Sequence, residues 1–178
     1  HLVISIAAGV TLRWLQARLP GVPVVRVMPN LPATVGCGFS AITLGRAATV
    51  RHRALAVSIF RAVGDVAELP ERHFDAITAV SGSGPAYVFY VVQMWQQAAR
   101  ELGLPPAVAE RAVHQTLRGS LCLLGCEGQS PQQLIARVAS KGGTTEAALR
   151  VLERQRVARR FGQALRAAAR RSATLARS

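Results

Sequence analysis

The stretch L-V-I-S-I-A-A-G-V-T-L-R-W-L-Q-A-R-L-P-G-V-P-V-V-R-V-M-P-N, residues 2–30, decides the fold. Residues 2–7 form an almost unbroken apolar run that is typical of a buried strand. Leucines then recur at helical spacing over residues 11–19, until Pro20 and Gly21 stop the helix. A second strand over residues 24–28 ends at a Pro-Asn pair. Strand, helix and strand at this spacing indicate an α/β sheet, in which ligands bind at the carboxyl ends of the strands.

The pattern changes from mixed to purely helical near residue 74. Before that point it predicts strands over residues 38–44 and 65–69, with a helix over residues 51–63 between them. After it, the periodicity predicts helices over residues 74–80, 85–102, 106–124, 131–139, 145–152 and 157–175. We therefore expect an α/β plus all-α chain with two domains, residues 1–70 and residues 71–178.

The composition limits the classes of function. The chain has 178 residues and a net charge of +13, and eight of its arginines lie between residues 154 and 177. Few aromatic residues accompany them, so a solvated helix face is favoured over a nucleic-acid-binding surface. The three cysteines lack the spacing of a disulfide framework or a metal site, which fits a reducing cytoplasm. No uncharged run has the composition of a membrane span.

The helix predicted over residues 85–102 begins with A-Y-V-F-Y-V-V, which is apolar on every side for two turns. Such a helix has to be covered on all sides. Because a domain of this size struggles to cover it alone, we expect a partner chain to do so.

The segment S-K-G-G-T-T-E-A-A-L, residues 140–149, has the properties of an anion-binding turn. Gly142 and Gly143 allow backbone N–H groups to face a ligand without obstruction by a Cβ atom. The helix that begins at Thr144 or Thr145 adds unpaired N–H groups, its positive dipole end and two hydroxyl donors. A carboxylate and a phosphate both suit such a turn, and an ordinary glycine-rich helix start is the alternative interpretation.

Two other motifs place polar groups at breaks in the chain. The stretch A-V-S-G-S-G-P-A-Y-V-F, residues 79–89, predicts a close approach of the backbone to a ligand, a partner or another segment. In R-V-M-P-N-L-P-A-T-V-G, residues 26–36, Asn30 follows a strand, where its amide suits a carboxamide, although a simple turn explains it as well.

Taken in order, R-V-M-P-N-x-P-A-x-V-G, A-V-S-G-S-G-P-A-Y-V-F and S-K-G-G-T-T resemble the pyrroline-5-carboxylate reductases. The resemblance extends from residue 1 to about residue 171 and includes S-I-A-A-G near the start. It implies hydride transfer from NADPH or NADH to the C5=N bond of Δ1-pyrroline-5-carboxylate, which gives L-proline in the last step of proline biosynthesis. It also implies a Rossmann-type parallel sheet, with residues 1–70 as its C-terminal part. A helical domain then forms homodimers or larger homo-oligomers.

The resemblance also assigns residues to two groups. The substrate group, which holds the carboxylate and the ring nitrogen, comprises Ser140, Gly143, Thr144 and Thr145, with Glu127 and Glu71 as acids on the substrate side. The cofactor group comprises Ala8 and Asn30 at the nicotinamide end, and Arg137 where the family often has Asn. Thr145 is the catalytic candidate, because it positions or donates a proton to the ring nitrogen. No metal site is expected.

The chain departs from the family pattern at several places. The glycine-rich loop G-x-G-x-x-G is absent from the sequence, so we expect a chain that begins after it and that binds the dinucleotide poorly alone. Cys37 stands where the family often has Glu or Ala, and Lys141 where it often has Pro. After Glu153, R-Q-R-V-A-R-R-F replaces the usual glycine-containing turn into the last helix.

Three alternatives stay open at this point. One is a truncated, inactive homologue that only dimerises. The second is a related reductase acting on another imine or on a β-hydroxy acid, although such enzymes keep a Lys and Asn pair on a catalytic helix, and Lys141 is alone on a loop. The third is an Arg-rich helical module that binds nucleic acid, for which a steep salt dependence of DNA affinity would be the signature.

Overall fold

The computed structural model describes residues 1–126 and 128–175, and the chain divides into two compact units. The first unit comprises His1–Tyr87 and Gly162–Ser178, and the second comprises Val88–Phe161. The domain boundary expected at residue 70 stays a prediction.

The first unit contains a four-stranded sheet in the order β1 (Val3–Ser5), β2 (Val24–Met28), β3 (Gly38–Leu44) and β4 (Gly64–Glu68). The β1–β2 and β3–β4 pairs are parallel, as expected, whereas β2 and β3 are antiparallel. The reason is the connection: only residues 29–37 join β2 to β3, which is too short for the crossover that a parallel pair needs. The expected parallel sheet is therefore mostly parallel, with one antiparallel pair in its middle that the sequence did not indicate.

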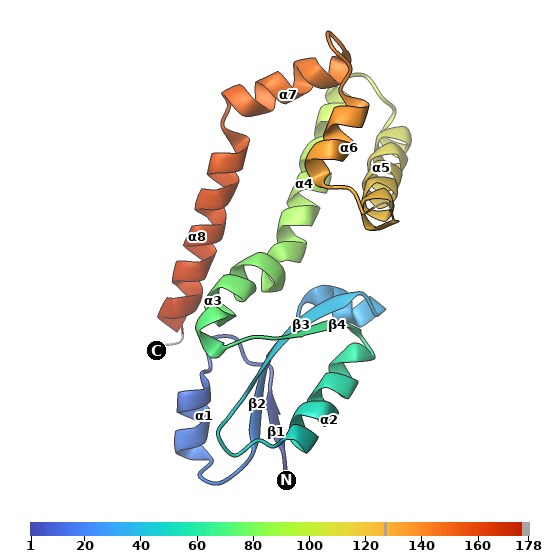
Figure 1. The fold of residues 1–178 in the computed structure, drawn as a ribbon. Helices are drawn as coiled ribbons and strands as arrows, with labels where there is room; N and C mark the ends of the chain where they lie inside the picture. The colour runs from blue at the N-terminus through green and yellow to red at the C-terminus, as the bar shows by residue number, and fades with distance from the viewer. Residues whose placement is uncertain (127, 176–178) are drawn as a thin grey trace. The chain divides into compact units, whose positions relative to one another are not determined.

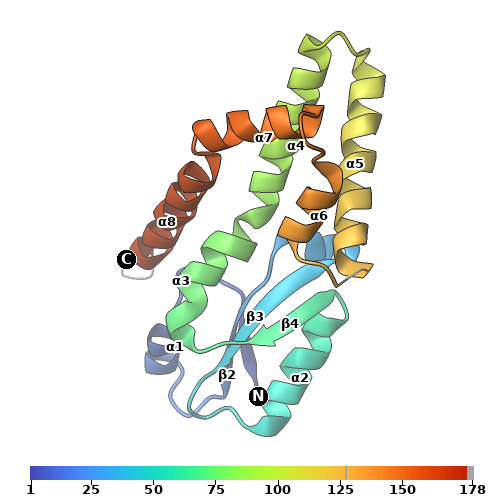
Figure 2. The same cartoon turned by 45° about the horizontal axis from the view of Figure 1, so that its top comes forward.

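Helices α1 (Leu12–Arg18) and α2 (Val50–Arg61) lie on opposite sides of this sheet (Figures 1 and 2). Neighbouring residues of β2 explain the arrangement, because successive side chains of a strand point to opposite faces. Val24 packs with the leucines of α1, while Val25 packs with Ala56 of α2. The helix and strand periodicities of residues 2–69 thus produce an α/β sheet, as the sequence predicts.

After β4 the chain forms a 3₁₀ turn (Glu71–His73), the short helix α3 (Phe74–Ile77) and a π-helical turn (Thr78–Gly82). One regular helix was expected over residues 74–80, and the π-turn corrects that expectation. It contains the first half of S-G-S-G, and the Ser83 N–H donates to the Thr78 carbonyl at 2.8 Å. Such wide turns occur frequently at functional sites.

The second unit is entirely helical. Its helices are α4 (Gly84–Glu101), α5 (Pro106–Cys126), α6 (Pro131–Val138), α7 (Thr144–Arg154) and the beginning of α8 (Val157–Leu175). Helices α5 and α6 lie side by side in both views (Figures 1 and 2). The Ser130 side chain accepts from Gln133 N–H and the Gln133 side chain accepts from Ser130 N–H, which is the capping box at the start of α6.

Few side chains of the second unit are buried within the chain. Only Ala99, Ala109 and Val113 are buried among its described residues, whereas Phe89 and Tyr90 of α4 are 58% and 62% exposed. The apolar helix that the sequence singled out is therefore uncovered in a single chain. None of the helices in the described part of the chain is long and apolar enough to span a membrane.

Candidate functional site

The turn between α6 and α7 has the conformation that the sequence indicates. The Gly143 N–H donates to the Ser140 carbonyl at 3.0 Å, which closes a four-residue β-turn. Gly142, the third residue of this turn, has φ 73°. Lys141, the second residue, is not among the residues with positive φ, so the turn is of type II. Glycine is needed at Gly142 because other residues are strained in this conformation.

Helix α7 begins at Thr144, with Gly143 as its N-cap residue. A Cβ atom at Gly143 would clash with the Ser140 hydroxyl, so the close approach of these two residues depends on glycine. Within the described residues, the N–H groups of Thr144 and Thr145 have no hydrogen-bond partner in the chain. They are two of the donors that an anion at a helix N-terminus uses.

Glu146 and Arg150 belong to this turn but were missed by the sequence analysis. The Gly142 N–H donates to Oε2 of Glu146 at 2.5 Å, and Arg150 donates to Oε1 of the same carboxylate at 2.6 Å. Two signals could have indicated this contact. Glu146 is the third residue of the helix, where acidic side chains reach back to the preceding turn, and Arg150 lies four residues further along the same face.

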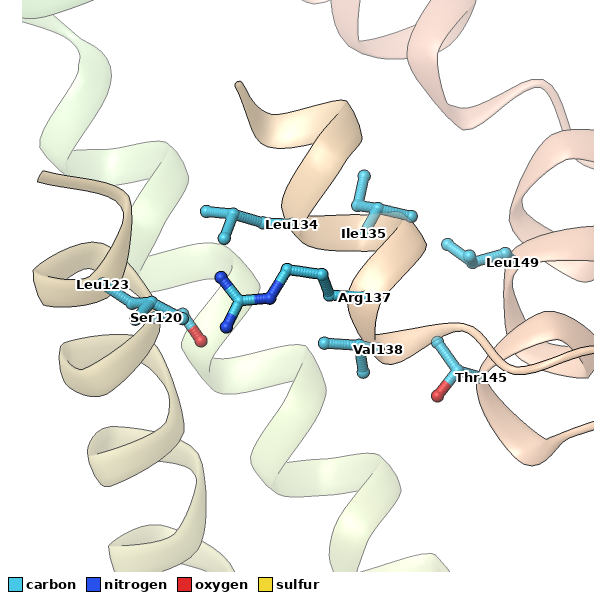
Figure 3. Close-up of a pocket in the computed structure, with 8 residues that line it drawn as sticks. All are labelled: Ser120, Leu123, Leu134, Ile135, Arg137, Val138, Thr145 and Leu149. Carbon is cyan, nitrogen blue, oxygen red and sulfur yellow. The ribbon is translucent and has the colours of Figure 1, made fainter. Parts of the chain in front are cut away.

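An apolar hollow of about 420 Å³ lies beside this turn in the second unit. Thr145 and Arg137 both line it, and Arg137 extends toward Ser120 and Leu123 of α5 (Figure 3). The remaining lining residues are Leu134, Ile135, Val138 and Leu149. The Arg137 guanidinium also donates to the Gln129 side chain at 2.9 Å. The second unit therefore places Thr145 at the edge of an apolar surface that also carries a cation.

Asn30 connects two of the sequence motifs within the first unit. Its side-chain oxygen accepts from the Phe39 N–H at 2.9 Å, and its amide nitrogen donates to the Ser81 hydroxyl at 3.2 Å. A Cβ atom at Gly82 would come within 2.5 Å of the Met28 side chain, so S-G-S-G packs directly on M-P-N. The backbone approach predicted for S-G-S-G is thus an approach to another segment of the chain. No local pattern in the sequence indicated that Ser81 is the partner of Asn30.

Glu71 is occupied by contacts within the first unit. Its Oε1 accepts from the Leu12 N–H at 2.7 Å and from the Arg26 guanidinium at 2.8 Å. The Arg26 side chain is only 5% exposed and its guanidinium also lies over the Phe74 ring, 4.7 Å from the centroid. The carboxylate therefore caps α1 and neutralises a buried cation, while its expected contact with substrate stays a prediction.

Ala8 and Glu127 are the two remaining residues expected at the site. Ala8 is exposed just beyond the carboxyl end of β1, beside exposed Ile6. Glu127 lies outside the described residues, so its expected role on the substrate side stays a prediction. Within the described residues, no group of His, Cys, Asp and Glu side chains is placed to hold a metal ion.

Comparison with known proteins gives consistent results. Residues 71–175 match the family model described as pyrroline-5-carboxylate reductase dimerisation. The pyrroline-5-carboxylate reductase of Synechocystis is 43% identical over 98% of this chain, and that of Corynebacterium melassecola is 40% identical over 97%.

The chain belongs to the pyrroline-5-carboxylate reductase family. The resemblance noted in the sequence and the expected fold class are both confirmed. The crystal structure of Plasmodium falciparum pyrroline carboxylate reductase with NADP bound superposes on 98% of this chain with a TM-score of 0.94 and 30% identity. The Coxiella burnetii pyrroline-5-carboxylate reductase covers 99% of the chain with a TM-score of 0.92 and 39% identity.

The matches cover nearly all of this chain but a smaller share of each related protein. The chain spans 65% and 64% of the two curated reductases named above, and 71% and 66% of the two solved reductases.

Proposed function

We propose that this chain is part of an NADPH- or NADH-dependent reductase that converts Δ1-pyrroline-5-carboxylate to L-proline. The observation that carries the proposal is the α6–α7 turn, in which the amides of Thr144 and Thr145 have no partner among the described residues and Thr145 lines an apolar hollow. A small imine with one carboxylate fits a site that offers N–H donors next to apolar surface. The curated relatives carry the name of this activity.

The proposed roles follow from the chemistry of the bound substrate. The carboxylate accepts from the N–H groups of the turn, with Ser140, Gly143 and Thr144 around it. The ring nitrogen lies toward Thr145, whose hydroxyl positions the proton that the nitrogen gains as the C5=N bond is reduced. The hydroxyl is too weak an acid to donate this proton freely, so it acts by orientation and relay. Glu127 and Glu71 are the proposed acids on the substrate side.

The cofactor supplies the hydride, and exposed residues of the first unit are suited to its nicotinamide end. Ile6 and Ala8 offer apolar surface beyond β1, and the carboxyl ends of neighbouring parallel strands are where such sheets bind ligands. The Asn30 side chain, already bonded to Phe39 and Ser81, would shape this edge more than bind the carboxamide. Arg137 is the proposed cofactor contact of the second unit.

We further propose that the protein works as a homodimer or a larger homo-oligomer in the cytoplasm. The match to a dimerisation domain and the uncovered apolar side chains of α4 support the homodimer. One alternative, a homologue that dimerises without activity, shares both of these supports.

The test is a reductase assay of the full-length protein. Incubation with Δ1-pyrroline-5-carboxylate and NADPH, or NADH, is expected to oxidise the cofactor and to form an equal amount of L-proline, quantified by chromatography. A folded dimer that forms no proline with either cofactor would refute the proposal and leave the inactive homologue as the better description.

A further inference from the structure

We infer that Glu146 makes the α6–α7 turn selective for a monocarboxylate over a dianion such as sulfate or phosphate, and that Arg150 reduces this selectivity. The inference rests on the proposed function, in which this turn holds the substrate carboxylate. Glycine-rich helix starts bind phosphates and carboxylates alike, so the backbone alone does not explain which anion is preferred. The side chains at the turn have to make the distinction.

The Glu146 carboxylate places a fixed negative charge directly at the turn. It accepts from the Gly142 N–H at 2.5 Å, so it occupies one donor of the turn that an incoming anion would otherwise use. The Gly143 N–H is bonded to the Ser140 carbonyl. The amides left for a ligand are those at the first positions of α7, directly beside the Glu146 charge.

The Glu146 carboxylate is held in place by a second contact. Arg150 donates to its other oxygen at 2.6 Å, one helical turn further along α7. The Glu146 side chain is 31% exposed and that of Arg150 is 68% exposed, so the positive charge of the pair is the more strongly screened by solvent. Seen from the turn, the carboxylate is also the closer of the two charges. The pair therefore presents a net negative character to a bound anion, although Lys141 at the turn offsets part of it.

Coulomb's law converts this charge into selectivity. A fixed charge acts on a dianion with twice the energy that it exerts on a monoanion at the same position. Removing the Glu146 charge should therefore lower the inhibition constant of a dianion by the square of the factor for a monoanion. Exposed charges contribute little to binding free energy. We therefore expect the inhibition constant to fall about twofold for the monoanion and about fourfold for the dianion.

The experiment uses the full-length protein with saturating NADPH and measures competitive inhibition against Δ1-pyrroline-5-carboxylate. Acetate is the monoanion and sulfate the dianion, compared at constant ionic strength. Glu146→Gln keeps an oxygen that can accept from the Gly142 N–H but removes the charge. The inhibition constant of sulfate should therefore fall more than that of acetate. Arg150→Gln should act in the opposite sense, weakening sulfate inhibition more than acetate inhibition.

Glu153→Gln is the matched control. Glu153 is on the same helix, about 10 Å further along its axis, a distance close to the screening length at physiological salt. Removing the Glu153 charge should leave the ratio of the acetate and sulfate inhibition constants unchanged.

If Glu146 had a purely structural role, Glu146→Gln would raise the inhibition constants of acetate and sulfate by a similar factor. That result would overturn the inference. An unchanged ratio in both Glu146→Gln and Arg150→Gln would do so as well, even if one variant proved poorly folded. If the wild-type protein forms no proline, the proposed function falls and this inference falls with it. If it forms proline and the ratio does not respond, only the selectivity assigned to Glu146 is wrong.

Discussion

Thr144 and Thr145 have the same side chain and adjacent positions at the start of α7, yet their surroundings differ. Thr144 is exposed, whereas Thr145 is half-buried and borders the apolar hollow. A hydroxyl against apolar surface has a more fixed orientation and a lower local dielectric constant than one in water. In the proposed mechanism, Thr145 is therefore the residue that orients the proton, and Thr144 contributes to carboxylate binding.

Thr145→Ala is expected to lower kcat about 10- to 100-fold with a smaller change in KM, because orientation of the proton matters mainly in the transition state. Thr144→Ala should raise KM more than it lowers kcat. Steady-state kinetics of proline formation by the full-length protein provide the measurement. Thr145→Ser, which keeps the hydroxyl, should recover most of kcat. A Thr145→Ala variant with the kcat of the wild type would remove this hydroxyl from the proposed mechanism.

Glu71 provides a second prediction at the scale of single residues. Glu71→Ala leaves the buried Arg26 guanidinium and the Leu12 N–H without their common acceptor. Losing one member of a buried pair costs about 3–5 kcal/mol, and we expect about 2–3 kcal/mol here because Glu71 is itself 31% exposed. Urea denaturation of the full-length protein measures this loss.

Glu68→Ala is the control for Glu71. Glu68 pairs with Arg53 at the surface, where both side chains are more than 40% exposed. Exposed pairs contribute about 0–1 kcal/mol, so this variant should unfold at nearly the urea concentration of the wild type. Equal midpoints for Glu71→Ala and the wild type would contradict the structural role of Glu71 and favour a role toward substrate.

The limits of prediction from sequence are clearest for single residues. The glycines of the α6–α7 turn and its threonines were found because their chemistry acts locally, within a few positions of the chain. The Glu71–Arg26 and Asn30–Ser81 pairs were not found, because their members lie 45 and 51 positions apart. Such partners are fixed by the packing of α3 and the π-turn on β2, which no local pattern encodes.

At the scale of elements, hydrophobic periodicity was sufficient for most helices and strands, and β2, β3 and α8 have the bounds expected from the sequence. The π-turn at Thr78–Gly82 was missed because it differs from an α-helix by a single additional residue per turn and has the same apolar periodicity. The antiparallel β2–β3 pair was missed because strand direction depends on the connection rather than on the strands.

The junction of α7 and α8 contains a residue with a strained backbone conformation. Arg156 follows the C-cap residue of α7 and has φ 54°, the only positive φ outside glycine among the described residues. This is the position where helices commonly end with glycine. A left-handed conformation costs a residue with a Cβ atom about 1–2 kcal/mol.

Arg156→Gly should therefore be more stable than Arg156→Ala by about 1 kcal/mol, because only glycine relieves the backbone strain. The alanine variant is the matched control, since both changes remove the guanidinium and the side-chain stem. The measurement is the midpoint of urea unfolding in the full-length protein, at an unchanged slope. Alanine and glycine variants of equal stability would show that this turn is not strained by its side chain.

At the scale of the whole molecule, the many exposed apolar side chains of the second unit cannot be explained by a single chain. Its exposed side chains on α4 include Val88, Phe89, Tyr90, Met94 and Trp95, and α6 and α7 have no buried residues. Burying one large apolar side chain contributes roughly 1.5–3 kcal/mol, whereas association itself costs at least about 4 kcal/mol. Several such side chains per chain are enough to exceed that cost, which is consistent with the match to a dimerisation domain.

Val88→Asp is therefore expected to weaken the proposed dimer of the full-length protein. Val88 is 52% exposed in α4, and an unpaired carboxylate buried at that point should cost about 3 kcal/mol or more, which corresponds to a 100-fold rise in the dissociation constant. Sedimentation velocity at micromolar concentration measures the change. Val50→Asp is the control, because Val50 is 79% exposed at the start of α2, where a carboxylate suits the helix terminus. If Val88→Asp sediments as a dimer like Val50→Asp, this part of α4 is not buried between subunits, and another surface must hold them together.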